Sequence, residues 1–160
     1  MIMNIAMQIH SMTGNTKNVA ESAAEALRAG GHKVEILALE SEGSYKKGDP
    51  SPPIISRPEL DAYDALVFGS HVEAFSLSSA MKAYLADLPD LKGRKTALLL
   101  TQFFPFQWMG GLRALGQGKK AVEAKGGVVV KELVVNWSRK DRDKRIALVG
   151  ASLAEVFSAS

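Results

Sequence analysis

The sequence predicts an α/β fold, a doubly wound parallel sheet of five strands with helices on both of its faces. Short apolar runs alternate along the chain with longer amphipathic segments, which is typical of parallel strands joined by helices. The run Ala65-Leu66-Val67-Phe68 is apolar at every position, as in a strand buried on both faces. With 160 residues, 46% hydrophobic and 23% charged, the chain resembles one globular domain, which we expect to span residues 1–160.

The apolar runs place the expected strands in order along the chain, at residues 2–9, 33–39, 63–69, 96–101 and 128–135. Four amphipathic segments predict the helices, at residues 15–29, 78–88, 109–125 and a last segment that follows Ser138. Gly30-Gly31 ends the first helix and Pro89 stops the second. Ser138 and Asp141 resemble a capping box for the last helix.

The connection between the second and third strands breaks this alternation. Residues 40–61 contain four prolines and two glycines, so a regular helix is not expected across the middle of the segment. We expect a long loop as the crossover, and the sequence assigns no role to its Pro-rich part, residues 48–58.

Composition excludes several kinds of chemistry. The chain has no cysteine, which excludes a thiolate nucleophile, an iron–sulfur cluster and a cysteine zinc site. A net charge of +3 is a small excess, so a nucleic-acid partner is not expected. No apolar run approaches the roughly 20 residues of a membrane helix, and the first residues do not resemble a signal peptide. We therefore expect a cytoplasmic chain without a membrane partner.

The segment Ser11-Met12-Thr13-Gly14-Asn15-Thr16 lies between the first expected strand and the first expected helix. It offers hydroxyl groups, a glycine that permits close approach of backbone, and the free N–H groups of a helix N-terminus. Such a loop can cradle a phosphate without a metal ion. The P-loop pattern is absent, and the Gly-x-Gly-x-x-Ala string at residues 116–121 lies within an expected helix, which is the wrong context for a dinucleotide motif.

These six residues resemble the FMN-phosphate loop of flavodoxins, a family with the pattern Ser/Thr-x-Thr-Gly-Asn-Thr after its first strand. Residues 68–78 resemble the second flavin loop of that family, and residues 101–111 fall where its third flavin loop belongs. The resemblance extends over essentially the whole chain. It implies the strand order 2-1-3-4-5 and noncovalent FMN, with the flavin ring held between the second and third loops.

The resemblance also implies which residues bind FMN. The phosphate would lie on the hydroxyls of Ser11, Thr13 and Thr16 and on the backbone N–H groups of Met12, Thr13, Gly14, Asn15 and Thr16. One side of the flavin ring would be lined by Ser70, His71, Val72, Glu73, Ala74 and Phe75, and the other by Gln102, Phe103, Phe104, Pro105, Trp108 and Met109. The aromatic residues, with Phe106, are candidates either for stacking on the ring or for packing in the core.

Glu73 stands near the place where flavodoxins often carry an aromatic residue. The stacking partner on that side is then absent or supplied by Phe75. A carboxylate beside the ring would disfavour an anionic reduced flavin, whereas the alternative is that Glu73 points to solvent. His71 could bond the flavin or relay a proton, or be an ordinary loop histidine, and His10 could add positive charge beside the phosphate loop.

The sequence favours an FMN-binding redox protein that transfers electrons through its flavin. Two alternatives remain: a NAD(P)H-dependent quinone or flavin reductase that uses FMN, and a flavin-free binding module that keeps the fold. The expected partner is a redox protein or a small-molecule electron acceptor. Flavodoxins that shuttle electrons between proteins are usually acidic, so the charge of +3 weighs against a mobile carrier of that kind.

Overall fold

A computed structural model describes residues 1–43, 45–46, 49–55 and 57–158. These residues form one sheet with the order β2-β1-β3-β5-β6, in which all neighbouring strands of the main path are parallel. The strands are β1 (Asn4–His10), β2 (Lys33–Ala38), β3 (Ala65–Glu73), β5 (Lys95–Gln102) and β6 (Val128–Asn136). Counted along the chain, the five parallel strands have the expected order 2-1-3-4-5. A two-residue strand that was not expected, β4 (Ser76–Leu77), pairs antiparallel with the end of β3.

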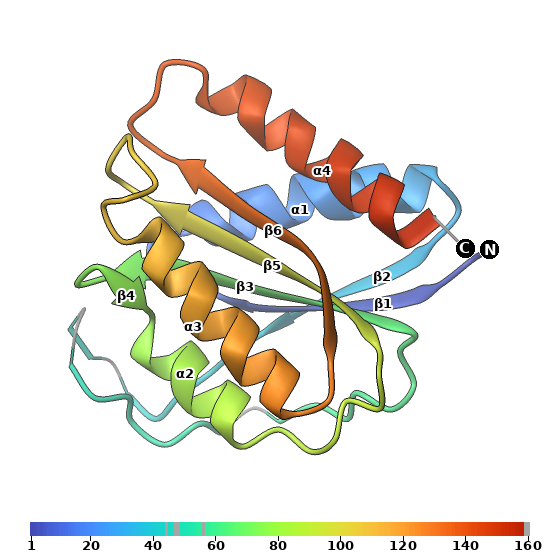
Figure 1. Cartoon of the computed structure of the whole chain (residues 1–160), viewed down its shortest axis with the longest axis horizontal. Helices are drawn as coiled ribbons and strands as arrows, with labels where there is room; N and C mark the ends of the chain where they lie inside the picture. The colour runs from blue at the N-terminus through green and yellow to red at the C-terminus, as the bar shows by residue number, and fades with distance from the viewer. Residues whose placement is uncertain (44, 47–48, 56, 159–160) are drawn as a thin grey trace.

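Helices cover both faces of the sheet, as predicted (Figure 1). On one face, α1 (Asn15–Ala29) and α4 (Arg142–Ser158) bury one apolar core; on the other, α2 (Ser79–Ala86) and α3 (Gly111–Ala124) bury a second. Gly150 of α4 lies directly against α1, because a Cβ atom there would come within 2.8 Å of the Ala26 Cβ. Both cores hold the strands rigidly, which fixes the positions of the loops that follow them.

The prediction that Ser138 caps the last helix is wrong. Helix α4 begins at Arg142, and the Ser138 N–H instead donates to the carbonyl oxygen of Phe103. Asp141, directly before the helix, accepts hydrogen bonds from Arg139 and Arg145. These two bonds, with Arg139 making the larger contribution, lower the pKa of Asp141 to about 2. Because the N–H groups of Trp137 and Ser138 donate to the carbonyls of Gln102 and Phe103, the chain extends the β5–β6 pairing by two residues before it turns into α4.

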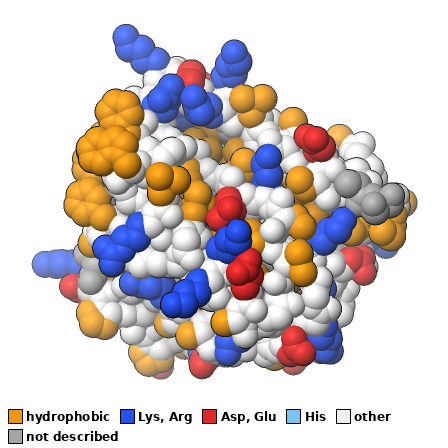
Figure 2. Space-filling model, viewed as in Figure 1, with side chains coloured by type: hydrophobic (Ala, Val, Ile, Leu, Met, Phe, Trp, Pro, Cys, Tyr) orange, Lys and Arg blue, Asp and Glu red, His pale blue; other side chains and the backbone are white. Residues whose placement is uncertain are grey.

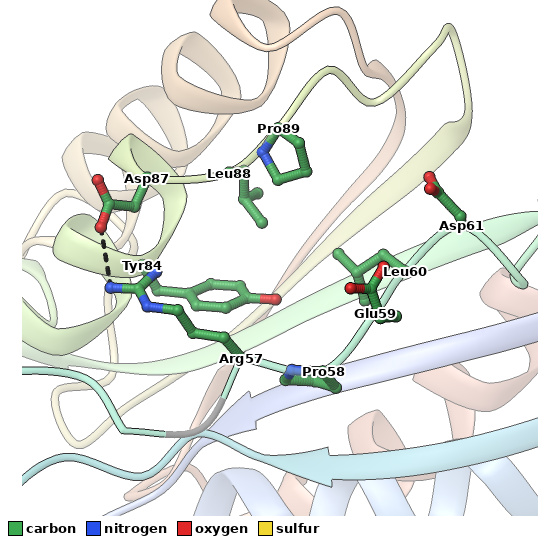
Figure 3. A pocket seen from close by; sticks show the side chains of 9 residues that line it. All are labelled: Arg57, Pro58, Glu59, Leu60, Asp61, Tyr84, Asp87, Leu88 and Pro89. Carbon is green, nitrogen blue, oxygen red and sulfur yellow. Dashed lines mark ion pairs between the residues drawn. The ribbon is translucent and has the colours of Figure 1, made fainter.

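The crossover between β2 and β3 contains no helix among its described residues, as expected. Ser41 and Ile54 form an isolated antiparallel bridge. Farther on, Arg57 pairs with Asp87 at 2.8 Å, and the Arg94 guanidinium donates to the Leu60 carbonyl. This end of the crossover and the end of α2 enclose a cavity of about 150 Å³ (Figure 3). Residues 48 and 56 of the Pro-rich part lie outside the described residues.

The carboxyl ends of β1, β3 and β5 lie side by side at one edge of the sheet, because these strands are neighbours and parallel. The loops after them are the three that the sequence singles out, and ligands of open α/β sheets bind at this edge. None of the helices in the described part of the chain is long and apolar enough to cross a membrane.

Candidate functional site

The first loop, residues 11–14, turns the chain from β1 into α1 and presents unpaired backbone donors. Gly14 adopts a left-handed conformation, with φ of 89°, that glycine tolerates without strain. The Gly14 and Lys17 N–H groups donate to Ser11 Oγ, at 3.1 and 3.3 Å. Within the described residues, the N–H groups of Met12, Thr13, Asn15 and Thr16 have no acceptor. These donors, at a helix N-terminus, suit a phosphate group.

The three hydroxyl groups of this loop have different surroundings. Thr16 is buried, and its Oγ1 lies 2.7 Å from Thr101 Oγ1 of β5, so its side chain ties α1 to the sheet. Ser11 Oγ is already engaged by the loop's own amides. Thr13 is exposed, and the Ser11 hydroxyl, which only accepts in these two bonds, keeps its proton for a further acceptor.

The second loop is a tight hairpin between β3 and β4. Its two turn residues, Ala74 and Phe75, both have positive φ, 50° and 59°. Type I′ turns of two-residue hairpins require this conformation at both positions, but Gly and Asn are the usual residues there, so Ala and Phe store strain. Gln117 of α3 holds the hairpin, because its Oε1 accepts from Leu77 N–H and Ser76 Oγ–H, at 2.8 and 2.9 Å. Strained turns held in this way are common at ligand sites.

The third loop, residues 103–110, keeps an aromatic run exposed at the surface. Phe103 and Trp108 are 67% and 73% exposed. Buried amides fix the loop from beneath: Gln102 Nε2 donates to the Phe106 carbonyl at 2.7 Å, and Asn136 Nδ2 donates to the Phe104 carbonyl at 2.8 Å. The hydrophobic side chains gather at the margin of the molecule beside Lys and Arg side chains of the β6–α4 connection (Figure 2).

A cavity of about 320 Å³ separates the second and third loops. Every residue that lines it belongs to the predicted flavin site: Val72, Glu73, Ala74, Phe75, Gln102, Phe103, Phe104 and Met109. Phe75 and Phe104 stack face to face across the two loops, with centroids 5.8 Å apart. Gly110 permits the third loop to lie close to the second, because a Cβ atom at Gly110 would lie 2.8 Å from the Phe75 Cα. Phe75 therefore supplies the aromatic group on the second-loop side.

The remaining predicted residues lie outside this cavity. Ser70 and His71 are buried beneath it in β3. Trp108 stacks on Phe106, with centroids 6.1 Å apart and both rings exposed. Pro105 does not line the cavity either. The structure thus groups the predicted residues into a phosphate loop, a ring-sized cavity and an outer aromatic patch.

A buried polar cluster that sequence reasoning missed lies under the site. His10 Nδ1 at the end of β1 is 2.8 Å from Ser78 Oγ, which is also 2.8 Å from Ser70 Oγ. Tyr45, from the long crossover, stacks on the His10 ring and places its hydroxyl 3.5 Å from Nε2. Burial, followed by the positive charge of His71, lowers the pKa of His10 to about 4. His10 is neutral at pH 7, so the prediction that it adds positive charge is wrong.

Glu73 is buried rather than solvent-facing, with 2% of its surface exposed. Its Oε1 accepts from the Ser79 N–H at the start of α2, and its Oε2 lies 2.7 Å from His71 Nε2. Burial raises the pKa of the carboxyl, but the bonds from Ser79 and His71 outweigh it, so the pKa lies below its usual value. Glu73 therefore joins β3 to α2 as an ionised, hydrogen-bonded carboxylate.

The residues present fit FMN. The cavity falls within the range of small-molecule sites, roughly 300–1,000 Å³, and its walls are aromatic and apolar as a flavin ring requires. Gln102, which lines the cavity, has a buried Oε1 without a hydrogen-bond partner among the described residues. The free N–H groups of the first loop lie at the same edge of the sheet.

The fold and the site define a flavodoxin-like flavoprotein. A point mutant of flavodoxin from Pseudomonas aeruginosa superimposes with a TM-score of 0.71 at 17% identity, over 98% of this chain and 100% of that chain. A WrbA-like flavodoxin from Agrobacterium tumefaciens gives 0.70 at 18% identity, over 98% and 96%. A flavoprotein from Lactobacillus acidophilus, solved in complex with FMN, gives 0.64 at 16% identity, over 89% and 97%.

Residues 4–141 match the model of the NADPH-dependent FMN reductase family, and the chain belongs to that family. It is also 33% identical, over 102 residues, to a NAD(P)H dehydrogenase (quinone) from Archaeoglobus fulgidus, covering 56% of this chain and 51% of that protein. An enzyme of the same name from Cupriavidus metallidurans is 32% identical over 83 residues, covering 48% and 42%. The chain thus spans about half the length of the curated relatives it matches. Family and neighbours together support FMN as the cofactor.

Proposed function

We propose that the protein uses bound FMN to pass reducing equivalents from NADH or NADPH to a quinone or a free flavin. The observation that carries this proposal is the 320 Å³ cavity between two aromatic loops, next to a phosphate-binding turn. The names of the family and of the curated relatives support a nicotinamide donor and a flavin or quinone acceptor.

Each part of the site has a separate task in this proposal. The N–H groups of the first loop and the hydroxyls of Ser11, Thr13 and Thr16 bind the phosphate of FMN. Phe75 and Phe104 line the cavity, and their apolar side chains exclude water from the flavin ring. FMN held in this site would supply hydride-accepting and electron-donating chemistry.

The protein's own contribution is the position and polarity of the cavity. Glu73 is held inward by Ser79 and His71, so the second loop presents a paired carboxylate rather than a free anion. The exposed aromatic patch, Phe103, Phe106 and Trp108, leaves an apolar surface beside the cavity. A nicotinamide or quinone ring can approach along this surface.

A titration with FMN, followed by flavin fluorescence, tests the cofactor site. We expect one FMN to bind per chain, and Thr13→Ala to weaken binding by roughly 1–3 kcal/mol because a charged acceptor loses a donor. Ser152→Ala on α4 removes a hydroxyl far from the site and serves as the control. Oxidation of NADH and NADPH by the FMN-loaded protein, with a benzoquinone or free FMN as acceptor, tests the activity. A folded protein that binds no FMN would refute the proposal.

The exposed aromatic patch also favours a second candidate, a one-electron carrier that docks on a redox protein. Phe103, Phe106, Trp108 and Leu112 are each more than half exposed, which is unusual unless a partner covers them. A carrier would bind FMN but oxidise NADH and NADPH negligibly without a reductase. The steady-state assay therefore separates the two candidates.

A further inference from the structure

A further cavity, of about 390 Å³, lies between α1 and the edge strand β2, apart from the flavin cavity. In Figure 1, β2 is the outermost strand beside α1. Helix α1 packs toward the centre of the sheet through Val19, Ala23 and Leu27, so the carboxyl end of β2 is left partly uncovered. The proposed flavin site does not use the space that results.

The walls of this cavity combine an apolar floor with a polar mouth. Ile9 at the end of β1 and Ile36, Ala38 and Leu39 at the end of β2 form the floor. Ser11, from the phosphate loop, lies at its border. Lys17 and Glu21, one helical turn apart on α1 and 4.0 Å from each other, complete the rim and are more than half exposed. The cavity is thus continuous with the anion-binding turn.

We propose that this cavity binds the adenosine diphosphate part of a dinucleotide. The branched aliphatic floor suits a flat adenine ring, the Lys17 ammonium suits a phosphate, and the Glu21 carboxylate suits ribose hydroxyls as an acceptor. The volume exceeds what a phosphate or a ribose alone would need. The inference rests on the proposed function for the presence of a dinucleotide donor.

The connectivity of the chain supports this assignment. In a β–α–β unit, a nucleoside can lie over the carboxyl end of the strand that follows the helix, with its phosphates near the first turn of that helix, where Lys17 lies here. Here β1 leads through residues 11–14 into α1, and β2 returns beside β1 in parallel. The cavity lies over the end of β2, one step outward from the phosphate turn.

A cavity-filling variant provides the test. Ala38 is exposed, so Ala38→Trp fills the cavity from the edge of the sheet without disturbing the core. Val128→Trp is the matched control, because Val128 is exposed and lies at the amino end of β6, the other edge strand. The protein is first saturated with FMN, which keeps the probe out of the flavin site, and is then titrated with ADP by calorimetry.

We expect ADP to bind the FMN-loaded protein, and Ala38→Trp to weaken ADP binding by about tenfold or more because the indole occupies the space. FMN affinity should be unchanged in both variants, which also shows that they fold. Absence of ADP binding, or ADP binding that Ala38→Trp leaves unchanged, overturns the inference. A milder variant, Ala38→Leu, decides the outcome if the Trp variant does not fold.

Two further measurements identify the source of the adenosine group. If it belongs to the electron donor, Ala38→Trp raises the KM for NADH or NADPH and leaves kcat unchanged. If it belongs to FAD, the wild-type protein binds FAD more tightly than FMN, and Ala38→Trp removes the difference. A protein that oxidises NADH but does not bind ADP would refute this inference alone. A protein that binds ADP in the cavity but oxidises neither nicotinamide would refute the proposed function alone.

Discussion

Protonation of His10 should make the protein lose stability as the pH falls from 6.5 to 4. His10 is buried at the end of β1 and is faced by Ser78, His71, Glu73 and Tyr45. Burial and then the nearby His71 lower its pKa from 6.5 to about 4, although Glu73 opposes the effect. The folded protein therefore keeps His10 neutral over a range in which the unfolded chain binds a proton.

The sign and size follow from proton linkage. A pKa that is lower in the folded state means that the unfolded state binds more protons, so the free energy of unfolding rises with pH. The contribution is complete above pH 6.5 and declines by about 1.4 kcal/mol for each pH unit below it. By pH 4 the loss is about 3 kcal/mol, a large part of the roughly 5–15 kcal/mol that stabilises a typical domain.

Urea unfolding of the wild-type protein and of His10→Gln, at several pH values between 7 and 4, measures this loss. Both proteins carry His32, His71 and all carboxylates, so the difference between them isolates His10. We expect the wild type to lose about 3 kcal/mol more than the variant over this range. Parallel pH dependences, or an imidazole resonance of His10 that titrates near pH 6.5, would refute the reasoning.

Three further substitutions test the loops. Glu73→Gln should lower the free energy of unfolding by roughly 3–5 kcal/mol at pH 7, because His71 and the Ser79 N–H lose a buried carboxylate. Since the pKa of Glu73 is lowered on folding, the difference in stability from wild type should shrink below pH 4.5. A difference that stays constant with pH contradicts this. Ala74→Gly should stabilise the protein by roughly 0.5–1 kcal/mol in urea unfolding, because glycine adopts a positive φ without strain. Ala83→Gly, at an exposed position of α2, is the control and should destabilise the protein. Equal effects of the two substitutions count against strain in the turn. Gly110→Ala should weaken FMN binding, because the added Cβ meets the Phe75 backbone. Gly93→Ala, also at a positive φ but in open space, is the control and should leave FMN binding unchanged. Equal FMN affinities of the two variants rule out the close approach.

The fold could be predicted because its signals are local. The apolar runs and the helix ends at Gly30 and Pro89 lie within a few residues of the elements they define, and α1 spans the predicted 15–29. The cap at Ser138 failed for a non-local reason. Its N–H group pairs with the Phe103 carbonyl across the β5–β6 ladder, and no pattern near Ser138 reveals that partner.

The site could be predicted only in part, for the same reason. The loops that form it are visible as motifs, but the orientation of a side chain within them depends on distant residues. Thr16 turns inward because Thr101 lies across the sheet, and Glu73 turns inward because α2 begins at Ser79. Tyr45 reaches His10 from a crossover that has no regular structure to predict its path.

The exposed aromatic loop is a local motif whose position depends on contacts with distant residues. An apolar run in contact with water would normally collapse onto the core, since burial of a Phe or Trp side chain is worth about 1.5–3 kcal/mol. Gln102 and Asn136, at the ends of adjacent strands, prevent this because their amides bind the loop's carbonyl groups from beneath. Each of these carbonyls has a second donor, since the Phe104 carbonyl also accepts from Gln102 and the Phe106 carbonyl from the Met109 N–H, so truncation of Asn136 would cost about 0.5–1.5 kcal/mol for one lost hydrogen bond. The aromatic patch is therefore maintained by buried polar groups, and its exposure is a built feature of the edge at which the proposed flavin site lies.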